Sequence, residues 1–259
     1  MVIRRIREHV AAQNWFAVGV DLAIVVVGVF LGTQANNWNQ ERIERGAARS
    51  YRAEIIENLR ANEISIDDQT AYYRRVLGHA LAALDALERP GSAMDQAFLV
   101  HAYQATQVRQ RQLTQSAYEE MKSAGLSRNV AEPETRARLS AFYAQMPQIN
   151  AATLTVTAYR DRLRRAMPIT IQRQLRERCG DIIRTLPGGV TGSILPERCV
   201  LRLDSESVAR AAARIRATSD LNLDLTRHIA DIDQKLRQLQ GFQRQARELR
   251  MQLESRDKG

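Results

Sequence analysis

The order of apolar and polar residues divides the chain into a short apolar segment near the N-terminus and a long amphipathic remainder. From Trp15 to Thr33 the only ionisable residue is Asp21. A helix of these nineteen residues would be about 28 Å long, which is close to the hydrocarbon thickness of a bilayer. The pattern therefore predicts a transmembrane helix over residues 15–35, preceded by a tail of residues 1–14.

Two other interpretations of the apolar segment remain open, a cleaved signal peptide and the buried helix of a soluble core. A basic start and the small-residue sequence that ends at Ala35 suit a signal peptide, but Asp21 would then interrupt its apolar region. The two tryptophans, Trp15 and Trp38, lie at the edges of the segment, where indole rings favour the membrane interface. We favour an uncleaved membrane anchor, marked by Trp15, Asp21, Gly28 and Trp38.

Asp21 admits two interpretations within the predicted anchor. It lies six residues, or about 9 Å of helix, inside Trp15, so it is near enough to the headgroup region to reach water. Alternatively, it pairs with another transmembrane helix, because an isolated carboxylate at the centre of a bilayer costs on the order of 3 kcal/mol. Gly19 and Gly28 leave room for a close helix approach, although these two are not spaced as a GxxxG pair.

Beyond the anchor, the spacing of apolar residues predicts long amphipathic helices over residues 38–87 and 204–254. The first helix could be interrupted near the polar sequence SIDDQT, residues 65–70. The second carries a stripe in which steps of four and three alternate, as they do in a heptad seam. The stripe consists of Leu225, Ile229, Ile232, Leu236 and Leu239. We expect it to pack within its own chain, with an intermolecular coiled coil as the alternative.

Composition agrees with a helical fold. Ala, Leu, Arg, Gln and Glu dominate, aromatic residues make up only 5%, and glycine and proline are few. In a helical hairpin, the last helix would run antiparallel to the helix that starts at Trp38. The predicted fold class is therefore all-α, with an N-terminal transmembrane helix followed by an antiparallel helical bundle over residues 36–259.

Two cysteines, Cys179 and Cys199, flank the stretch that is richest in glycine and proline. A disulfide between them would close a loop over residues 179–199 and contribute roughly 3 kcal/mol by restricting the unfolded chain. Such disulfides persist in oxidising compartments, whereas two buried thiols are the alternative. The arginines that flank the anchor do not decide its orientation, but the cysteine pair favours a periplasmic location for residues 36–259.

The net charge of +9 is carried almost entirely by arginine and is compatible with nucleic acids or anionic headgroups as partners. The arginines are spread along the chain and alternate with acidic residues, without a compact basic run. This distribution is not typical of a nucleic-acid-binding surface. We therefore expect the lipid bilayer, and no nucleic acid, among the partners.

No catalytic or metal-binding motif is recognisable in the sequence. The four histidines are not spaced as metal ligands usually are, and no P-loop, dinucleotide or nucleophile-elbow motif occurs. The glycine-rich sequence LPGGVTG lacks the lysine that a phosphate-binding loop requires. His228 and Asp231 are three residues apart, which is typical of a solvated helix face. We predict no enzymatic activity, no cofactor and no metal site.

A small-molecule site between helices is a weaker expectation. The residues that could line it are Ser116, Tyr118, Glu119 and Glu120. Helix capping and packing explain these residues equally well.

Two blocks of sequence carry a family signal. The first is the polar motif after the apolar segment, which consists of Asn36, Asn37, Trp38 and Asn39 within TQANNWNQER. The second, residues 114–146, begins TQSAYEEMKSAGL and ends in a helix with paired aromatic residues. Together they resemble the DUF6090 type, a family of bacterial single-span membrane proteins of unknown function. The resemblance implies an uncleaved anchor and a helical domain, and it implies no activity.

These features favour a non-catalytic single-pass protein of the bacterial inner membrane. It would be an accessory or scaffold subunit that acts through helix-mediated contacts with other membrane subunits or with a second copy. The N-terminal tail would lie in the cytoplasm and residues 36–259 in the periplasm. The alternative is a periplasmic ligand-binding or sensory module that signals through partners, and an enzyme is the third class.

Overall fold

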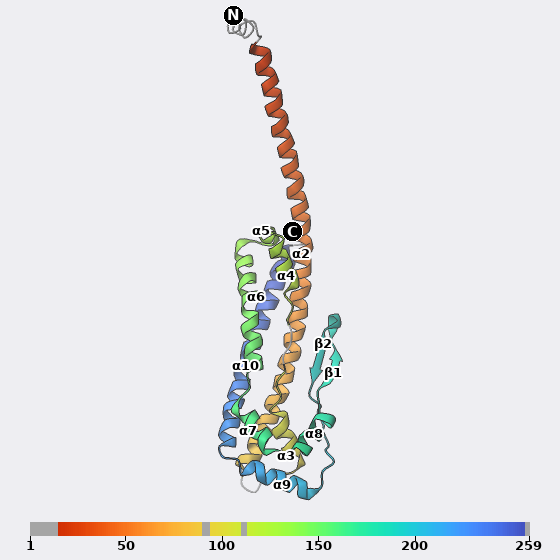
Figure 1. Ribbon diagram of the computed structural model, residues 1–259, viewed down its shortest axis with the longest axis vertical. Helices are drawn as coiled ribbons and strands as arrows, with labels where there is room; N and C mark the ends of the chain where they lie inside the picture. Colours follow the sequence, from red (N-terminus) through yellow and green to blue (C-terminus); the bar gives the residue numbers. More distant parts are fainter. Residues whose placement is uncertain (1–14, 90–93, 110–112, 257–259) are drawn as a thin grey trace, which may run out of the picture. The chain divides into compact units, whose positions relative to one another are not determined.

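The computed structural model describes residues 15–89, 94–109 and 113–256, with side chains from residue 19 to residue 255. In this part of the chain the protein is mostly helical (Figure 1). The chain divides into two units, Met1–Ser50 and Tyr51–Gly259. The elements are α2 (Trp15–Glu88), α3 (Gln96–Gln104), α4 (Ser116–Ser123), α5 (Ser127–Val130), α6 (Pro133–Leu154), α7 (Ala158–Ala166), α8 (Ile169–Arg178), β1 (Ile182–Thr185), η1 (Pro187–Gly189), β2 (Thr191–Ile194), α9 (Ser205–Arg216) and α10 (Leu221–Arg256).

Helix α2 includes the apolar segment of the first unit and the first helical stretch of the second. The polar sequence at residues 65–70 does not interrupt it, and both Ile66 and Asp68 are buried there. The Asp68 carboxylate accepts hydrogen bonds from Arg184 at 2.7 Å and from the backbone N–H of Ser193 at 3.2 Å. Because these donors compensate the carboxylate, an acid is tolerated on the buried face of the helix.

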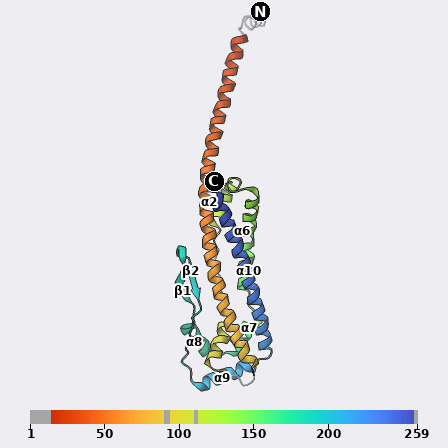
Figure 2. The ribbon, with the colours of Figure 1, turned by 180° about the vertical axis from the view of Figure 1, so that it is seen from behind.

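In the second unit, α10 packs against both α2 and α6 (Figures 1 and 2). Arg60 of α2 lies 3.0 Å from Glu254 of α10, and Glu63 lies 2.6 Å from Arg250. Residue numbers rise along α2 as they fall along α10, so these two helices run in opposite directions. These ion pairs link the two antiparallel helices along the edge of their contact.

The helix that was expected over residues 204–254 is in fact two helices, α9 and α10. Asp204 caps the start of α9, where its carboxylate accepts a hydrogen bond from the backbone N–H of Ser207 at 2.7 Å. Before α10 begins, Asp220 adopts a φ of 58°, in the left-handed region that ends a helix. The single-helix prediction was wrong because the break carries no glycine or proline in the sequence.

The apolar stripe of α10 faces the core of its own unit. Leu225, Ile232, Leu236 and Leu239 are buried, and Ile229 is half-buried against the core. Farther along the helix, the ring of Phe242 stacks on that of Phe142 from α6, with centroids 4.3 Å apart. The stripe therefore supplies intrachain packing.

The segment between the two cysteines forms a β-hairpin, which the all-α prediction did not include. Strands β1 and β2 are antiparallel, with Ile182 opposite Ile194. Gly188 and Gly189 form the turn with φ values of 71° and 74°, which residues that have a Cβ rarely adopt. Both views place the hairpin beside α2 (Figures 1 and 2), and the buried Asp68 links the two elements.

Candidate functional site

The apolar part of α2 exposes the side chains that would contact a bilayer. From Val20 to Leu31 every large apolar side chain is between 41% and 64% exposed. Among the described residues, α2 is the one helix that is long and apolar enough to cross a membrane, judged by length and composition. The core helix of a soluble protein would bury such residues, so this pattern argues against that interpretation.

Asp21, Gly28 and Gly32 lie on one face of α2, because steps of seven and four residues return a helix to nearly the same direction. Gly28 and Gly32 have the four-residue spacing that allows transmembrane helices to approach closely. No atom lies within 4 Å of a Cβ placed at either glycine. Gly32 was missed from the sequence, where Gly28 was compared with Gly19, which lies on the opposite face.

The polar motif after the apolar segment is helical and exposed. Asn36, Asn37 and Asn39 all belong to α2, and the guanidinium of Arg42 lies 5.8 Å from the Trp38 ring. Of the two predicted interface tryptophans, Trp38 is 64% exposed, while the side chain of Trp15 lies outside the described residues. The motif therefore continues the helix without a turn at the expected membrane boundary.

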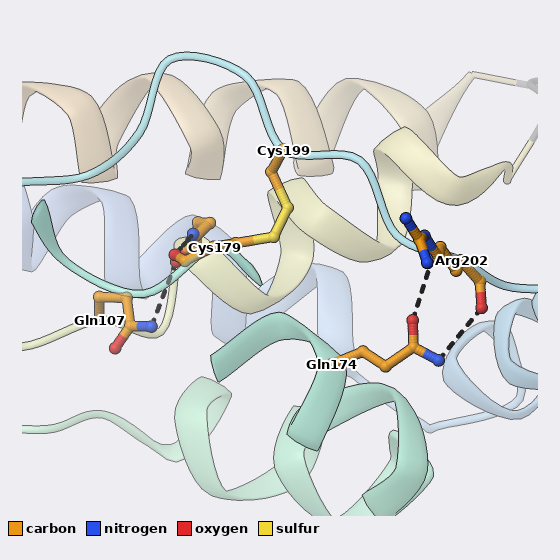
Figure 3. Close-up of a disulfide and its surroundings, with 6 residues drawn as sticks. Gln107, Gln174, Cys179, Cys199 and Arg202 are labelled. Atoms are coloured by element: carbon orange, nitrogen blue, oxygen red, sulfur yellow. Dashed lines mark hydrogen bonds between the residues drawn. A yellow bond between two sulfur atoms is a disulfide. The ribbon is translucent and has the colours of Figure 1, made fainter. Parts of the chain in front are cut away.

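Cys179 and Cys199 form a disulfide with their Cα atoms 5.4 Å apart (Figure 3), which confirms the predicted pairing. Cys179 is buried at the end of α8, and its carbonyl accepts a hydrogen bond of 2.7 Å from Gln104. Beyond Cys199, Gln174 exchanges two hydrogen bonds of 3.0 and 3.1 Å with the backbone of Arg202 (Figure 3). Glutamine side chains thus hold the backbone near both ends of the covalent link.

A cavity of about 350 Å³ lies between α4, α5 and α6. Its wall combines apolar and aromatic side chains, among them Tyr118, Met121 and Leu139, with two serines and the cations Lys122 and Arg136. Lys122 also lies 3.3 Å from the Glu119 carboxylate, and Arg136 donates to the carbonyl groups of Arg128 and Ala131. Both cations therefore also contact acceptors of this chain.

One of the four residues considered for a small-molecule site lines this cavity. Tyr118 does so, and its ring stacks on that of Tyr143 with centroids 4.3 Å apart. Ser116, Glu119 and Glu120 do not line it. Two residues fix the local fold around the cavity, since Pro133 begins α6 and Gly125 has the positive φ of a helix end.

His79 of α2 and His101 of α3, 22 residues apart in sequence, meet through their Nδ1 atoms at 2.9 Å. Their ring centroids are 5.0 Å apart, and both side chains are half-buried. Burial lowers the pKa of His79 to about 4 and also lowers the pKa of His101. At neutral pH both rings are neutral, and one Nδ1–H donates to the other Nδ1.

His228 is buried, which contradicts the expectation of a solvated helix-face pair with Asp231. Its Nδ1 lies 2.8 Å from the hydroxyl of Thr157, and its Nε2 lies 2.7 Å from the carbonyl oxygen of Ala105. Two turns farther along α10, Lys235 donates to the carbonyl of Thr155 at 2.6 Å. These side chains satisfy backbone groups, so we interpret them as packing elements of the core.

Comparison with known proteins finds no match for this chain among family models, curated proteins or solved structures. The resemblance to the DUF6090 type therefore stays a prediction. Functional inference rests on the residues and geometry of this chain.

Proposed function

We infer that this protein is a non-catalytic, single-pass subunit of a bacterial inner-membrane assembly. In this proposal residues 15–35 span the membrane, the N-terminal tail is cytoplasmic, and residues 36–259 form a periplasmic helical bundle. The observation that carries the proposal is the face of α2 on which Asp21, Gly28 and Gly32 lie within an exposed apolar segment. An anchor without a partner needs neither an acid nor closely spaced glycines on that face.

The chemistry of this face favours another helix as its partner. A carboxylate in apolar surroundings is stabilised by a cation or a hydrogen-bond donor from a neighbouring helix. Gly28 and Gly32 have no side chain beyond hydrogen, so a second backbone can pack directly against them. Asn39, five helical turns after Asp21, extends the same face beyond the apolar segment.

The disulfide supports the periplasmic placement of the helical domain. The bond between Cys179 and Cys199 joins buried and half-buried positions of the second unit. Disulfides of this structural kind form in the bacterial periplasm and are rare in the cytoplasm. The positive-inside rule does not decide the orientation, because arginines flank both ends of the apolar segment.

Cross-linking of the full chain in its native membrane, followed by purification in mild detergent and mass spectrometry, tests this function. We expect defined partners, or a second copy of the chain, cross-linked to the wild type. Gly28→Leu and Gly32→Leu should reduce the cross-linked fraction severalfold, because a leucine on this face keeps the helices apart. Gly19→Leu, on the opposite face, is the matched control. A chain that stays monomeric, or equal yields from all three variants, would sink the proposal.

The cavity between α4, α5 and α6 supports a second candidate, a ligand-binding module. Its volume of about 350 Å³ is at the lower end of the range for small-molecule sites. Thermal-shift screening with small amphiphilic anions is the direct test, since the wall holds the cations Lys122 and Arg136 together with apolar side chains such as Met121. A stabilising compound whose effect disappears in Met121→Trp would support this candidate, whereas the absence of any stabilising compound would count against it.

A further inference from the structure

Helices α7 and α8 carry a concentration of positive charge. Residues 160–178 contain seven arginines and only two acidic residues. Both helices contact α3, and in both views α7, α8 and α9 lie at the same end of the second unit (Figures 1 and 2). The arginine cluster, defined as Arg160, Arg164 and Arg176, lies where α7 and α8 meet the end of α3.

Two guanidinium groups of the cluster converge on Thr106, just beyond the end of α3. Arg160 donates to the Thr106 carbonyl, and Arg164 donates through Nε and Nη2 to the Thr106 hydroxyl, at 3.0 and 2.9 Å. The Arg164 guanidinium also lies over the Tyr103 ring, 4.8 Å from its centroid. Since Thr106 is fully buried and both arginines are half-buried, neutral groups of the chain hold these two positive charges in place.

Arg176 joins the cluster through its place on α8. Gln172, four residues earlier on the same face, donates to the carbonyl of Arg164 at 2.6 Å. Cys179, three residues later, accepts a hydrogen bond of 2.7 Å from Gln104 at the end of α3. Arg176 lies between these two contacts and is exposed, and its guanidinium makes no hydrogen bond or ion pair within the described part of the chain.

No carboxylate compensates the cluster. Among the residues that the structure describes, no ion pair joins Arg160, Arg164 or Arg176 to an aspartate or glutamate. Burial lowers the pKa of Arg164, and the charges of Arg160 and Arg176 act in the same direction. Tyr103 and Asp161 act in the opposite direction, without an ion pair to Asp161. All three guanidinium groups stay protonated at neutral pH, so they repel one another in the folded chain.

Other arginines that join distant segments of this unit do have an acidic partner. Arg109, Arg184 and Arg250 each lie 2.6 or 2.7 Å from a carboxylate oxygen. Capping of a helix C-terminus explains one guanidinium at the Thr106 carbonyl. It does not explain two further positive charges at the same place. An anion from outside the chain would compensate them.

We propose that Arg160, Arg164 and Arg176 bind a phosphate group beside the end of α3. Guanidinium groups bind phosphate oxygens through paired N–H donors, and a phosphate monoester carries about two negative charges at neutral pH. Arg160 and Arg164 use only one and two of their N–H groups within the chain, so each retains donors for the ligand. Two sources offer this group, a soluble phosphate ester and a phospholipid headgroup, and they differ in the attached acyl chains. The site does not depend on the partner of the transmembrane helix.

The test is calorimetric titration of the full chain in detergent and phosphate-free buffer. The probes are inorganic phosphate, glycerol phosphate and a short-chain phosphatidic acid below its micellar concentration. We expect one phosphate-binding site per chain, which acetate at the same concentration does not occupy. A headgroup site binds the phosphatidic acid about tenfold or more tightly than glycerol phosphate, whereas a site for a soluble ester binds the two equally well. Absence of binding by all three probes would overturn the proposal.

Variants of the cluster make the assignment specific to these residues. Arg164→Gln and Arg176→Gln should each weaken phosphate binding about tenfold, because each removes a charged donor. Arg178→Gln removes the same charge from the opposite face of α8 and should change binding less than about twofold. Arg164→Lys should weaken binding severalfold, since lysine keeps the charge and loses the paired donors.

The exposed position of Arg176 separates binding from folding. Arg176→Gln removes no contact of the described residues, so its melting temperature without phosphate should equal that of the wild type. Phosphate should raise the melting temperature of the wild type and of Arg178→Gln more than that of Arg176→Gln. Equal weakening of phosphate binding in Arg176→Gln and Arg178→Gln would indicate a diffuse effect of net charge and would contradict the site.

Discussion

Helix α2 contains two regions in which the same kinds of residue have opposite exposure. In residues 20–31 the valines, leucines and isoleucine are exposed, whereas in residues 51–88 apolar side chains such as Ile55 and Leu59 are fully buried. The first region is apolar on nearly all sides, and the second has one apolar face with polar residues opposite. Helical structure is common to both, so the distribution of apolar residues around the axis is what distinguishes the exposed apolar region from the core-facing one.

The largest effect should come from placing charge in the first region. Val25→Arg together with Val26→Arg would oppose membrane insertion by about 5–7 kcal/mol, because each arginine near the centre of a span costs roughly 3 kcal/mol. We expect the protein to leave the membrane fraction after an alkaline wash. Leu81→Arg, at an apolar position of the second region that is 50% exposed, should leave the membrane fraction unchanged. If the double arginine variant and Leu81→Arg were found in the membrane fraction to the same extent, the two regions of α2 would not differ in their contact with the membrane.

The next effect concerns the core of the second region. Leu59→Ala should lower the free energy of unfolding of the helical domain by about 2–5 kcal/mol, because it removes a fully buried side chain and leaves a cavity. Leu22→Ala removes the same atoms from a position that is 64% exposed, so it should leave domain unfolding unchanged. Chemical denaturation in detergent, followed by circular dichroism, measures both. A loss below about 1 kcal/mol for Leu59→Ala would show that this face is not a true core.

Removal of the disulfide should destabilise the second region by a comparable amount. Cys179→Ser together with Cys199→Ser removes the restriction on the unfolded loop, at a cost of roughly 3 kcal/mol. The melting temperature should fall, while the membrane fraction should match that of the wild type. The wild type with reductant is the control and should show the same fall; no change with reductant would mean that the link contributes nothing to stability.

A smaller effect should follow from pH in the second region. Burial lowers the pKa of His79 to about 4 and also lowers that of His101 and His228. As the pH falls below about 6.5, the unfolded chain binds protons that the folded chain does not, so stability decreases towards pH 4. With EDTA present, the melting temperature at pH 5 should be below that at pH 7. His79→Gln should reduce this difference, and a difference equal to that of the wild type would contradict the role of burial.

Local signals in the sequence predicted much of the structure. The apolar segment and the helix start at Asp204 both depend on neighbours in the chain. The spacing of the cysteines around a glycine-rich segment likewise indicated the disulfide. A stronger local signal was overlooked in IIRTLPGGVTGSI, where two β-branched runs flank a Pro-Gly-Gly turn and form the hairpin.

Features that depend on distant partners could not be predicted in this way. His79 meets His101 only because α3 packs on α2, and no sequence spacing marks that contact. The polar sequence at residues 65–70 suggested an interruption of the helix because Arg184, the partner of Asp68, lies 116 residues later in the chain. The cavity between α4, α5 and α6 likewise exists only once three separate helices are packed. Chemistry formed by tertiary packing is therefore visible only in the structure.

The disulfide has a consequence for proteolysis. The hairpin lies within a loop whose two ends, Cys179 and Cys199, are covalently joined. A protease that cuts at the exposed turn around Gly188 and Gly189 would leave both fragments attached to each other. The nicked chain would migrate as one species on a non-reducing gel and separate into two only after reduction. Gel electrophoresis without a reducing agent therefore does not reveal a cut in this turn.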